Sequence, residues 1–533
     1  MNEKSAFLEK ALFCPFSILL SVREVCLPIH DGSPLANEVI AFLGGGLGFA
    51  IYDIYTYSQR PLDGELAQSD ILFARTDLDL FSKKGWPCLG RSASYDVLVV
   101  PEIGQVLEVS GSGGQVVERP AVSGRTVLGS RLSTVIKRWS DGPFISSVKA
   151  TIRAMQQERK AASELRGYHT RARQMGTTVP SPGRLRTLLA QRLGSRRKTL
   201  KQKGDLSIFV AYAVRNWEQV LPLALKSLGS VSEFEWRRQG YDDGRADWAE
   251  QRDRMNRDML RVFQEAQRRR PIDVVVGYLS GHNMSPETLQ EMTKAGAVVL
   301  NFCWDDKLNF PGPIVGGRYI SPAAIAHAVD LNLTNSPDSV IKYMVHGGLA
   351  MFWPEAAHPE IHRPYEVPFE FDVSFVGACY GWRPTFIRAL CKRGIHVECF
   401  GNSWPNGPLS DTEMVRLYSR SRVNLGFAGV GHSRRLMCLK ARDFEVPMSG
   451  GLYMTQDNPE LSLVYEVGSE IVTYTDADDC AEKIKRLLDY PDEAEQIRRA
   501  GRARALKDHT WERRFRDAFD VAGVIRSADG DGS

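Results

Sequence analysis

Residues 272–302 read IDVVVGYLSGHNMSPETLQEMTKAGAVVLNF, and this stretch decides the fold of the middle of the chain. Two apolar runs, 272–278 and 297–302, flank a segment with helical spacing that opens at Ser285, with Glu287 in its first turn. Nearly continuous apolar runs indicate strands that are buried on both faces. A strand, a helix and a strand in this order predict a parallel sheet covered by helices.

The same alternation extends to both sides of this stretch. Apolar runs at 206–211 and 331–334 predict two more strands, and helical spacing recurs at 217–228, 252–269, 322–328 and 336–346. These elements predict a Rossmann-like domain over 204–365.

The alternation restarts after the proline-rich segment 354–368, which we interpret as an interdomain linker. Strands are predicted at 373–376, 396–400, 423–427, 452–455 and 471–474, and helices at 384–393, 411–419, 477–488 and 492–506. The expected fold class is therefore α/β, with a second Rossmann-like domain over 366–525 and a disordered tail over 526–533. Two such domains in tandem place a ligand cleft where the carboxyl ends of their strands face each other.

The first 203 residues have a different character. Short apolar runs and glycine-rich turns predict a mixed, β-rich N-terminal region of unknown role over 1–140. Residues 141–203 predict a basic helical linker, since 149–203 hold fifteen Lys or Arg against two acids. The alternative is a patch at 184–203 that contacts anionic membranes or an acidic acceptor. Nucleic acid is not expected as a partner, because Tyr168 is the only aromatic residue of 149–203 that can stack on a base.

The overall composition is that of an ordinary globular protein, with 43% hydrophobic and 25% charged residues and a net charge of +4. The apolar run 11–22 is shorter than the about 20 residues of a membrane span. We therefore expect a cytoplasmic protein, with a peripheral membrane contact as the alternative. The nine cysteines contain no CxxC pair, so we expect reduced thiols and predict no metal site.

The segment KARDFEVPMSGG, which begins at Lys440, carries the clearest ligand-binding pattern. Lys440 and Arg442 bring positive charge suited to a diphosphate, and an arginine can bind it through two nitrogens. The carboxylate of Glu445 can accept hydrogen bonds from both hydroxyls of a ribose. Backbone N–H groups at Gly450 and Gly451 can approach phosphates without an intervening Cβ. The alternative is a surface helix on which Arg442 and Glu445 pair with each other.

Around this segment the sequence resembles the C-terminal half of the CgeB-like (spore-maturation-type) glycosyltransferases, which have the GT-B fold. The resemblance rests on KARDFEVPMSGGLYMTQDNPEL (440–461), YEVGSEIVTYTDADDCAEKI (465–484) and HTWERR (509–514). It extends upstream to VGACYGWR (376–383), with Gly377 and Arg383, which is similar to the first loop of the family's donor domain. In the preceding domain it includes Asn216-Trp217 and Trp304-Asp305-Asp306.

The resemblance implies a hexosyltransferase-like enzyme that moves a sugar from a nucleotide-sugar donor to a glycan, lipid or protein acceptor. It implies no cofactor and no obligatory metal. Glu445 falls at the second glutamate of the E-x7-E pattern of related retaining enzymes, which contacts the ribose, whereas Met437 stands at the first. That departure leaves retention or inversion of the sugar open. His432, on a glycine-rich stretch, can reach the diphosphate or the sugar; the alternative is an ordinary loop histidine.

An inverting transfer also needs a general base near the acceptor hydroxyl. The candidates are His282, Asp305 and Asp306, each of which follows a predicted strand of the first domain; caps and loop hydrogen bonds are the alternative. Trp511 and its neighbours match the family and are expected to fix the final helix. Two other functions stay open: an epimerase or phosphorylase of the same fold, and a non-catalytic glycan-binding scaffold, which the missing glutamate at Met437 favours.

Overall fold

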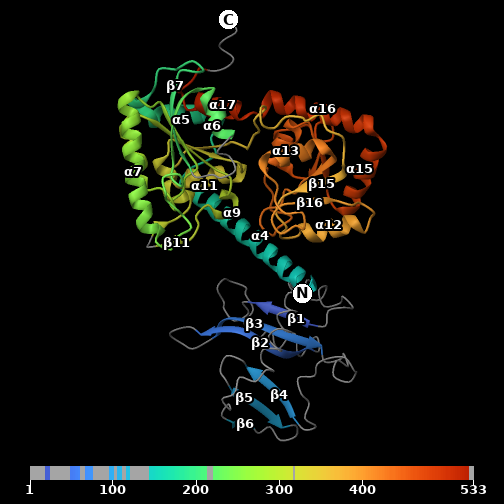
Figure 1. Cartoon of the computed structure of the whole chain (residues 1–533). Coiled ribbons are helices and arrows are strands. Elements are labelled where there is room, and N and C mark those ends of the chain that lie inside the picture. Colours follow the sequence, from blue (N-terminus) through green and yellow to red (C-terminus); the bar gives the residue numbers. More distant parts are fainter. Residues whose placement is uncertain are drawn as a thin grey trace. The chain divides into compact units, whose positions relative to one another are not determined.

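The computed structural model describes residues 19–23, 49–59, 66–75, 95–100, 105–110, 116–119, 143–212, 220–315 and 318–526. The chain divides into two units, Met1–Ile136 and Lys137–Ser533 (Figure 1). The first unit contains two antiparallel sheets, one of order β1-β3-β2 and one of order β4-β5-β6. Their strands are β1 (Leu19–Arg23), β2 (Phe49–Gln59), β3 (Leu66–Arg75), β4 (Tyr95–Val100), β5 (Gln105–Ser110) and β6 (Val116–Arg119).

The second unit begins its α/β architecture with a six-stranded sheet in which every neighbouring pair is parallel. Along the sheet lie β14 (Ala350–Phe352), β13 (Leu331–Thr334), β10 (Val298–Cys303), β9 (Val274–Gly277), β7 (Leu206–Tyr212) and β8 (Gly229–Glu235). Successive side chains of a strand point to opposite faces, so Ile208 and Val276 belong to one core and Phe209 and Val275 to another. The helices of this domain include α6 (Val220–Lys226), α7 (Trp248–Arg269), α8 (Pro286–Lys294), α9 (Asp306–Asn309), α10 (Pro322–Ile325) and α11 (Val340–Val345).

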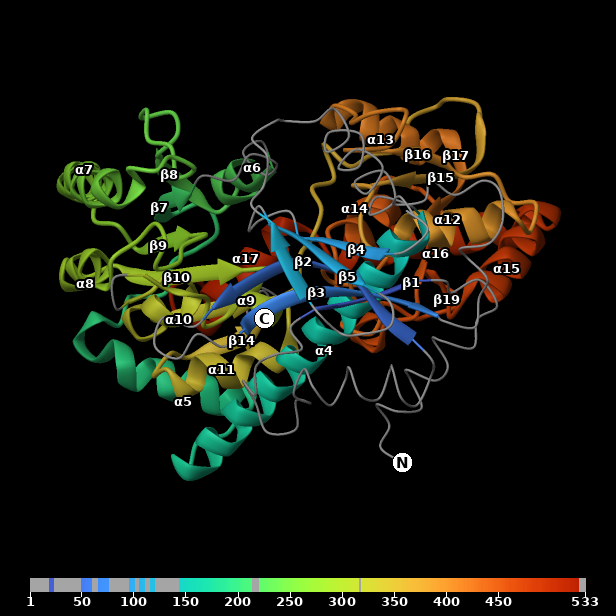
Figure 2. The same cartoon turned by 90° about the horizontal axis from the view of Figure 1, so that it is seen from below.

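A second parallel sheet of five strands follows the proline-rich segment. Its order is β16 (Glu398–Phe400), β15 (Phe371–Val376), β17 (Ser421–Leu425), β18 (Tyr453–Gln456) and β19 (Val472–Tyr474). Its helices are α12 (Arg383–Cys391), α13 (Asp411–Arg420), α14 (Arg442–Met448), α15 (Ala477–Asp489) and α16 (Pro491–Asp508). Figure 2 shows the two sheets side by side, each between layers of helices. The predicted tandem Rossmann-like architecture of the GT-B type is confirmed.

Two strands that the sequence did not reveal, β8 and β14, lie at the two edges of the first sheet. An edge strand has one neighbour and needs no continuous apolar run. β8 reads GSVSEFE, and of its residues only Gly229, Phe234 and Glu235 are buried. Continuous apolar runs in the sequence therefore predicted the central strands but not the edge strands.

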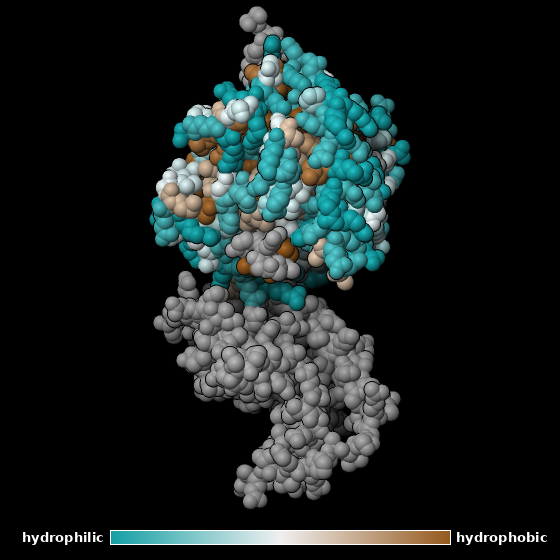
Figure 3. Space-filling model, turned by 90° about the vertical axis from the view of Figure 1, so that its left-hand side faces the viewer, coloured by the Kyte–Doolittle hydropathy of each residue, from teal (hydrophilic) through white to brown (hydrophobic). Residues whose placement is uncertain are grey.

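The long helix α7 shows how the outer surface is made. Met255, Met259 and Phe263 are buried under it at helical spacing, whereas Arg257 and Arg261 are exposed. The face that carries this helix is accordingly largely hydrophilic (Figure 3).

The segment predicted as a linker is part of the first α/β domain, so that prediction is wrong for 182–203. Leu185, Leu189 and Leu193 of α5 (Pro182–Leu193) are buried in the core on one face of the sheet. The leucines recur at spacings of four, which gives the helix one apolar stripe.

The basic side chains of this segment are also used inside the fold. Four of them form ion pairs: Arg186–Asp520 at 2.5 Å, Arg196–Asp330 at 2.7 Å, Lys201–Asp273 at 2.6 Å and Lys203–Glu512 at 2.5 Å. Arg192 donates to the backbone oxygens of Val329 and Gly347 at 3.0 and 2.6 Å. These pairings account for positive charge that the sequence suggested for a membrane or an acidic acceptor.

The last helix, α17 (Trp511–Val521), packs on the first domain although it follows the second in sequence. The backbone of Ala357 exchanges two hydrogen bonds, each of 3.0 Å, with His509 and Trp511. The ring centroid of Trp511 lies 5.6 Å from those of Trp304 and Trp353. The C-terminal segment therefore joins the two domains, in keeping with the expected structural role of Trp511.

We expect the alanine substitution of Leu189 to lower the free energy of unfolding by about 2–5 kcal/mol, because it opens a cavity under α5. Alanine in place of the exposed Gln191, on the same helix, should change it by less than about 0.5 kcal/mol. Urea unfolding followed by tryptophan fluorescence measures both. Equal stability of the two variants would contradict the assignment of α5 to the core.

Candidate functional site

The start of α14 is the centre of the candidate site in the second domain. Asp443 fixes this helix start, because its carboxylate accepts hydrogen bonds from the backbone N–H of Lys440 at 2.7 Å and from the hydroxyl of Tyr453 at 2.8 Å. The ammonium group of Lys440 donates to the sulfur of Cys438 at 3.0 Å. Lys440 and Arg442 are half-buried, so their charges lie in a medium that screens them less than water does.

Glu445 lies one turn further along α14 and is only 9% exposed. Burial raises the pKa of its carboxyl to about 7, against the opposing effect of Arg442. Its Oε1 is 3.8 Å from Nε2 of His362, whose own pKa burial lowers to about 4. The histidine is therefore neutral at pH 7, and the contact does not neutralise the carboxylate. The alternative of a solvent-exposed Arg442–Glu445 surface pair does not fit this burial.

Two loops approach this helix from the carboxyl ends of β15 and β17. Arg383 is 5% exposed, donates to the backbone oxygen of Ala378 at 3.0 Å and lies 4.3 Å from the ring centroid of Tyr380. Burial lowers the pKa of Arg383, and the charge of Arg442 lowers it further. The structure thus brings Arg383 into the electrostatic field of the α14 segment.

His432 is held on the second loop by a helix from outside both Rossmann-like sheets. Its backbone N–H donates to Oε1 of Gln157 at 2.9 Å, on α4 (Pro143–Gln174). Its ring lies against Tyr380, with centroids 6.4 Å apart. Burial lowers the pKa of the imidazole. His432 and Gln157 line a cavity of about 330 Å³ with Arg153, Gln156 and Lys160.

Three glycines were predicted to contact the donor, and the structure gives each a backbone role. Gly377 donates its N–H to Phe400 at 2.8 Å, and its carbonyl accepts from the indole of Trp404 at 2.8 Å. The N–H groups of Gly450 and Gly451 donate to the carbonyls of Pro447 and Val446 at 2.9 and 3.0 Å. They close the C-terminal end of α14, where carbonyls rather than free N–H groups gather. Gly450 and Gly451 are therefore withdrawn as phosphate ligands.

The acceptor-side candidates separate into two environments. His282 and Asp305 line one cavity of about 410 Å³ at the carboxyl ends of β9 and β10. Oδ2 of Asp305 accepts a hydrogen bond of 2.9 Å from the hydroxyl of Tyr278. Nε2 of His282 lies 3.3 Å from the backbone oxygen of Asp243. These two side chains can meet a ligand in the same cavity.

Asp306 lies outside that cavity, with no exposed surface. Its carboxylate accepts hydrogen bonds from Thr334 at 3.0 Å and from Tyr343 at 2.8 Å, and burial raises its pKa to about 6. Both carboxylate oxygens are thus engaged inside the domain. The structure assigns Asp306 a structural role and removes it from the candidate bases.

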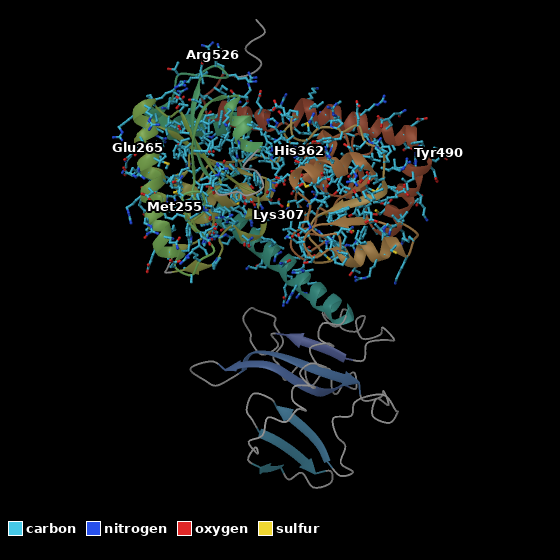
Figure 4. The ribbon with its side chains drawn as sticks, in the orientation of Figure 1. Met255, Glu265, Lys307, His362, Tyr490 and Arg526 are labelled. Carbon is cyan, nitrogen blue, oxygen red and sulfur yellow. The ribbon has the colours of Figure 1, made fainter. Side chains whose placement is uncertain are left out.

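The next residue, Lys307, connects the two domains. Its ammonium group donates to the backbone oxygen of Met437 and to Oε1 of Glu460 at 2.8 Å, both in the second domain. The Lys307 and Glu460 side chains are 12% and 13% exposed, so little water competes for the pair. Figure 4 shows Lys307 and His362 in the region between the two α/β domains. Helix α9, which follows β10, therefore meets the segment after β17 and the segment after β18.

Glu355 is a site residue that sequence reasoning missed. It is 6% exposed, and its Oε2 has no hydrogen-bond partner in the part of the chain that the structure describes. Burial raises the pKa of its carboxyl to about 8, against the effect of Lys440, and Glu445 raises it further. The proline-rich composition of 354–368 indicated a linker and hid this residue; a lone acid between Trp353 and two alanines was the available signal.

Comparison with known proteins bears on this domain. Residues 383–520 match the family model described as glycosyl transferase-like. The range includes Arg383, His432, Lys440, Arg442 and Glu445. The glycosyltransferase part of the resemblance is thereby confirmed for the second domain, although the match does not single out the CgeB-like family. No curated protein shows a significant match to the chain.

Several solved structures share the general architecture. Sucrose-phosphate synthase from Thermosynechococcus elongatus is 12% identical, with a TM-score of 0.42, over 59% of this chain and 99% of the other. Anabaena Alr3699/HepE in complex with UDP and glucose is 11% identical, with a TM-score of 0.40, over 59% and 99%. A glycosyltransferase from Rickettsia africae is 10% identical, with a TM-score of 0.42, over 60% and 98%. Likeness at this level does not bear on the activity of this chain.

Metal-binding groups, membrane-spanning helices and cysteines can be reported for the residues that the structure describes. No group of three or more His, Cys, Asp or Glu side chains placed to hold a metal ion occurs among them. None of the helices described is long and apolar enough to cross a membrane. The cysteines of these ranges are free thiols, and Cys303, Cys399, Cys438 and Cys480 are buried. Asn216-Trp217, part of the resemblance, lies outside the described residues.

Stability should fall as the pH rises from about 6.5 to about 8. The folded pKa values of Glu445, about 7, and Glu355, about 8, lie above the unfolded value of 4.5. The stability that these raised pKa values provide is complete below the unfolded value and is lost as the pH rises through the folded values. His362 and His509, with folded pKa values of about 4, act in the opposite direction, but their contribution is complete near pH 6.5.

Melting temperatures at pH 6.5 and 8, measured by calorimetry, test this slope. Glu355→Gln should reduce the loss of stability, whereas Glu360→Gln, an exposed control in the same segment, should leave it unchanged. A slope that is flat, or that is identical in all three proteins, would contradict the burial of these carboxyls.

Proposed function

We propose that the protein is a glycosyltransferase that takes a sugar from a nucleotide-sugar donor. The observation that carries the proposal is the gathering of Lys440, Arg442 and Glu445 at the half-buried start of α14, inside the region that matches the glycosyl transferase-like model. Two cations beside a buried carboxylate suit a diphosphate joined to a ribose.

The proposed chemistry needs charge stabilisation more than covalent catalysis. As the bond between the sugar and the diphosphate breaks, positive charge develops on the sugar and negative charge on the leaving diphosphate. Lys440 and Arg442, fixed near the start of α14, would stabilise the leaving group without reorganising. Arg383, whose pKa responds to Arg442, is the third cation of this region. Partial burial strengthens these interactions relative to water.

The acceptor side of the proposal rests on the cavity that contains His282 and Asp305. If the sugar is inverted, one of them would take the proton of the acceptor hydroxyl. Tyr278 orients the Asp305 carboxylate through its hydrogen bond, which favours Asp305 over His282. A hydroxyl-bearing glycan, lipid or protein is the class of acceptor that fits this chemistry.

We expect Glu445→Ala to weaken nucleoside diphosphate binding by roughly ten- to a hundredfold, because hydrogen bonds to a charged group contribute about 1.5–3 kcal/mol each. Glu445→Gln keeps the shape and one acceptor, so its loss should be smaller. Glu482→Ala, at an exposed glutamate of α15, is the matched control. Calorimetric titration with UDP, GDP, ADP and TDP measures all four proteins. A folded Glu445→Ala protein that binds as tightly as the parent would refute the donor site.

A further inference from the structure

Glu355 is fixed in place by its neighbours on both sides. It follows β14 by three residues, at the carboxyl end of the first sheet. On one side, the indole of Trp353 donates to the backbone oxygen of Arg514 at 2.8 Å, and its backbone N–H donates to Thr334 at 2.6 Å. On the other side, Ala357 is bonded to the segment that leads into α17. The backbone therefore has little freedom to move this carboxyl out of the site.

The surroundings of Glu355 come from the opposite domain. Ala357, two residues further on, lies in one apolar cluster with Leu439 and Phe444, and Phe352 packs against the same cluster. Lys440, Glu445, Asp443 and Arg442, which act on the Glu355 carboxyl, belong to that same segment of the second domain. The thiol of Cys438 is influenced by Glu355 in turn. Glu355 thus belongs to a part of the first domain that packs against the segment with the cations and the carboxylate of the proposed donor site.

No hydrogen bond to Oε2 from the described residues explains why this acid is kept there. Its Oε2 is fully buried and has no hydrogen-bond partner among the described residues. An unpartnered buried carboxyl destabilises the fold, and an apolar side chain of the same size would remove that cost. A buried polar group that costs stability and has no partner is typical of a residue that binds ligand.

We propose that Glu355 binds the sugar of the nucleotide-sugar donor through hydrogen bonds with its hydroxyls. The inference rests on the proposed function and adds a specificity residue to it. A carboxyl can pair with hydroxyls in either protonation state, because the neutral form donates and accepts and the ionised form accepts. The diphosphate does not suit Glu355, since an ionised carboxyl would repel it and the cations that suit it belong to the α14 segment. The ribose is the partner assigned to Glu445, which leaves the sugar for Glu355.

The test compares the binding of nucleoside diphosphates with that of the corresponding nucleotide sugars. Calorimetric titrations use UDP, GDP, ADP and TDP and their glucose, galactose, mannose and N-acetylglucosamine derivatives, with the full chain. The variants are Glu355→Leu and Glu355→Gln, and Glu360→Leu is an exposed control in the same segment. Thermal unfolding of each ligand-free protein is measured alongside.

We expect Glu355→Leu to weaken nucleotide-sugar binding by about tenfold or more, while diphosphate binding stays within about twofold of the parent. Glu355→Gln should lose less of the nucleotide-sugar affinity. If the leucine variant does not fold, the glutamine variant is compared with the parent instead. The ligand-free leucine variant should melt at a higher temperature than the parent. Glu360→Leu should leave both affinities unchanged.

The outcomes separate the inference from the function on which it rests. Equal loss of diphosphate and nucleotide-sugar binding, or no loss of either, would overturn the assignment of Glu355 to the sugar. If the parent protein binds a diphosphate and binds every nucleotide sugar no more tightly than that diphosphate, the assignment of Glu355 to the sugar is also overturned. The donor site would not be contradicted by that result. A parent that binds none of the nucleotides would refute the proposed function itself.

Discussion

The packing of α17 on the first α/β domain is the interaction on which the arrangement of the two α/β domains depends. Trp511 lies within 5.6 Å, between ring centroids, of Trp304 and Trp353, and Trp353 lies 5.3 Å from Phe515. Trp304 follows β10 and Trp353 follows β14, so this aromatic cluster sits at the carboxyl ends of two strands. Large aromatic side chains bury much apolar surface and hold a defined geometry. The cluster thereby ties the end of the second domain to the carboxyl ends of the strands of the first sheet.

This anchoring explains why charged groups of two domains can share one buried environment. Lys307 reaches Met437 and Glu460 from the first domain, and Glu355 meets the start of α14 from the segment beside the cluster. Burial raises the pKa values of Glu355, Asp443 and Glu445 together. A site of this kind costs stability in the ligand-free protein, but its charges need little reorganisation when substrate binds.

The sequence was a good guide where burial is uniform and a poor one where a residue's surroundings come from distant segments. The central strands, such as β9 and β10, were predicted because both of their faces are apolar. The edge strand β8 was missed because it needs only one buried face. The basic segment around α5 was read as solvated because its acidic partners, such as Asp330 and Asp520, lie far along the chain.

The residues of the candidate site also differ in whether local sequence could predict them. Lys440, Arg442 and Glu445 could be proposed from local spacing, and the structure keeps them together at the start of α14. Asp306 was indistinguishable from Asp305 in sequence, because only the fold turns one into the core and the other into a cavity. Glu355 could not be found from its neighbours, since the charges around it belong to a helix start that is more than eighty residues away.

The most direct test of the central claim is a crystal structure with a bound nucleoside diphosphate. The claim predicts that the ribose hydroxyls lie within hydrogen-bonding distance of the Glu445 carboxylate and that the diphosphate contacts Lys440 or Arg442. The end of the diphosphate would then point toward Glu355. A nucleotide bound in the cavity that contains Tyr278 and Asp305, with the start of α14 left free, would contradict the assignment of the donor site to the second domain.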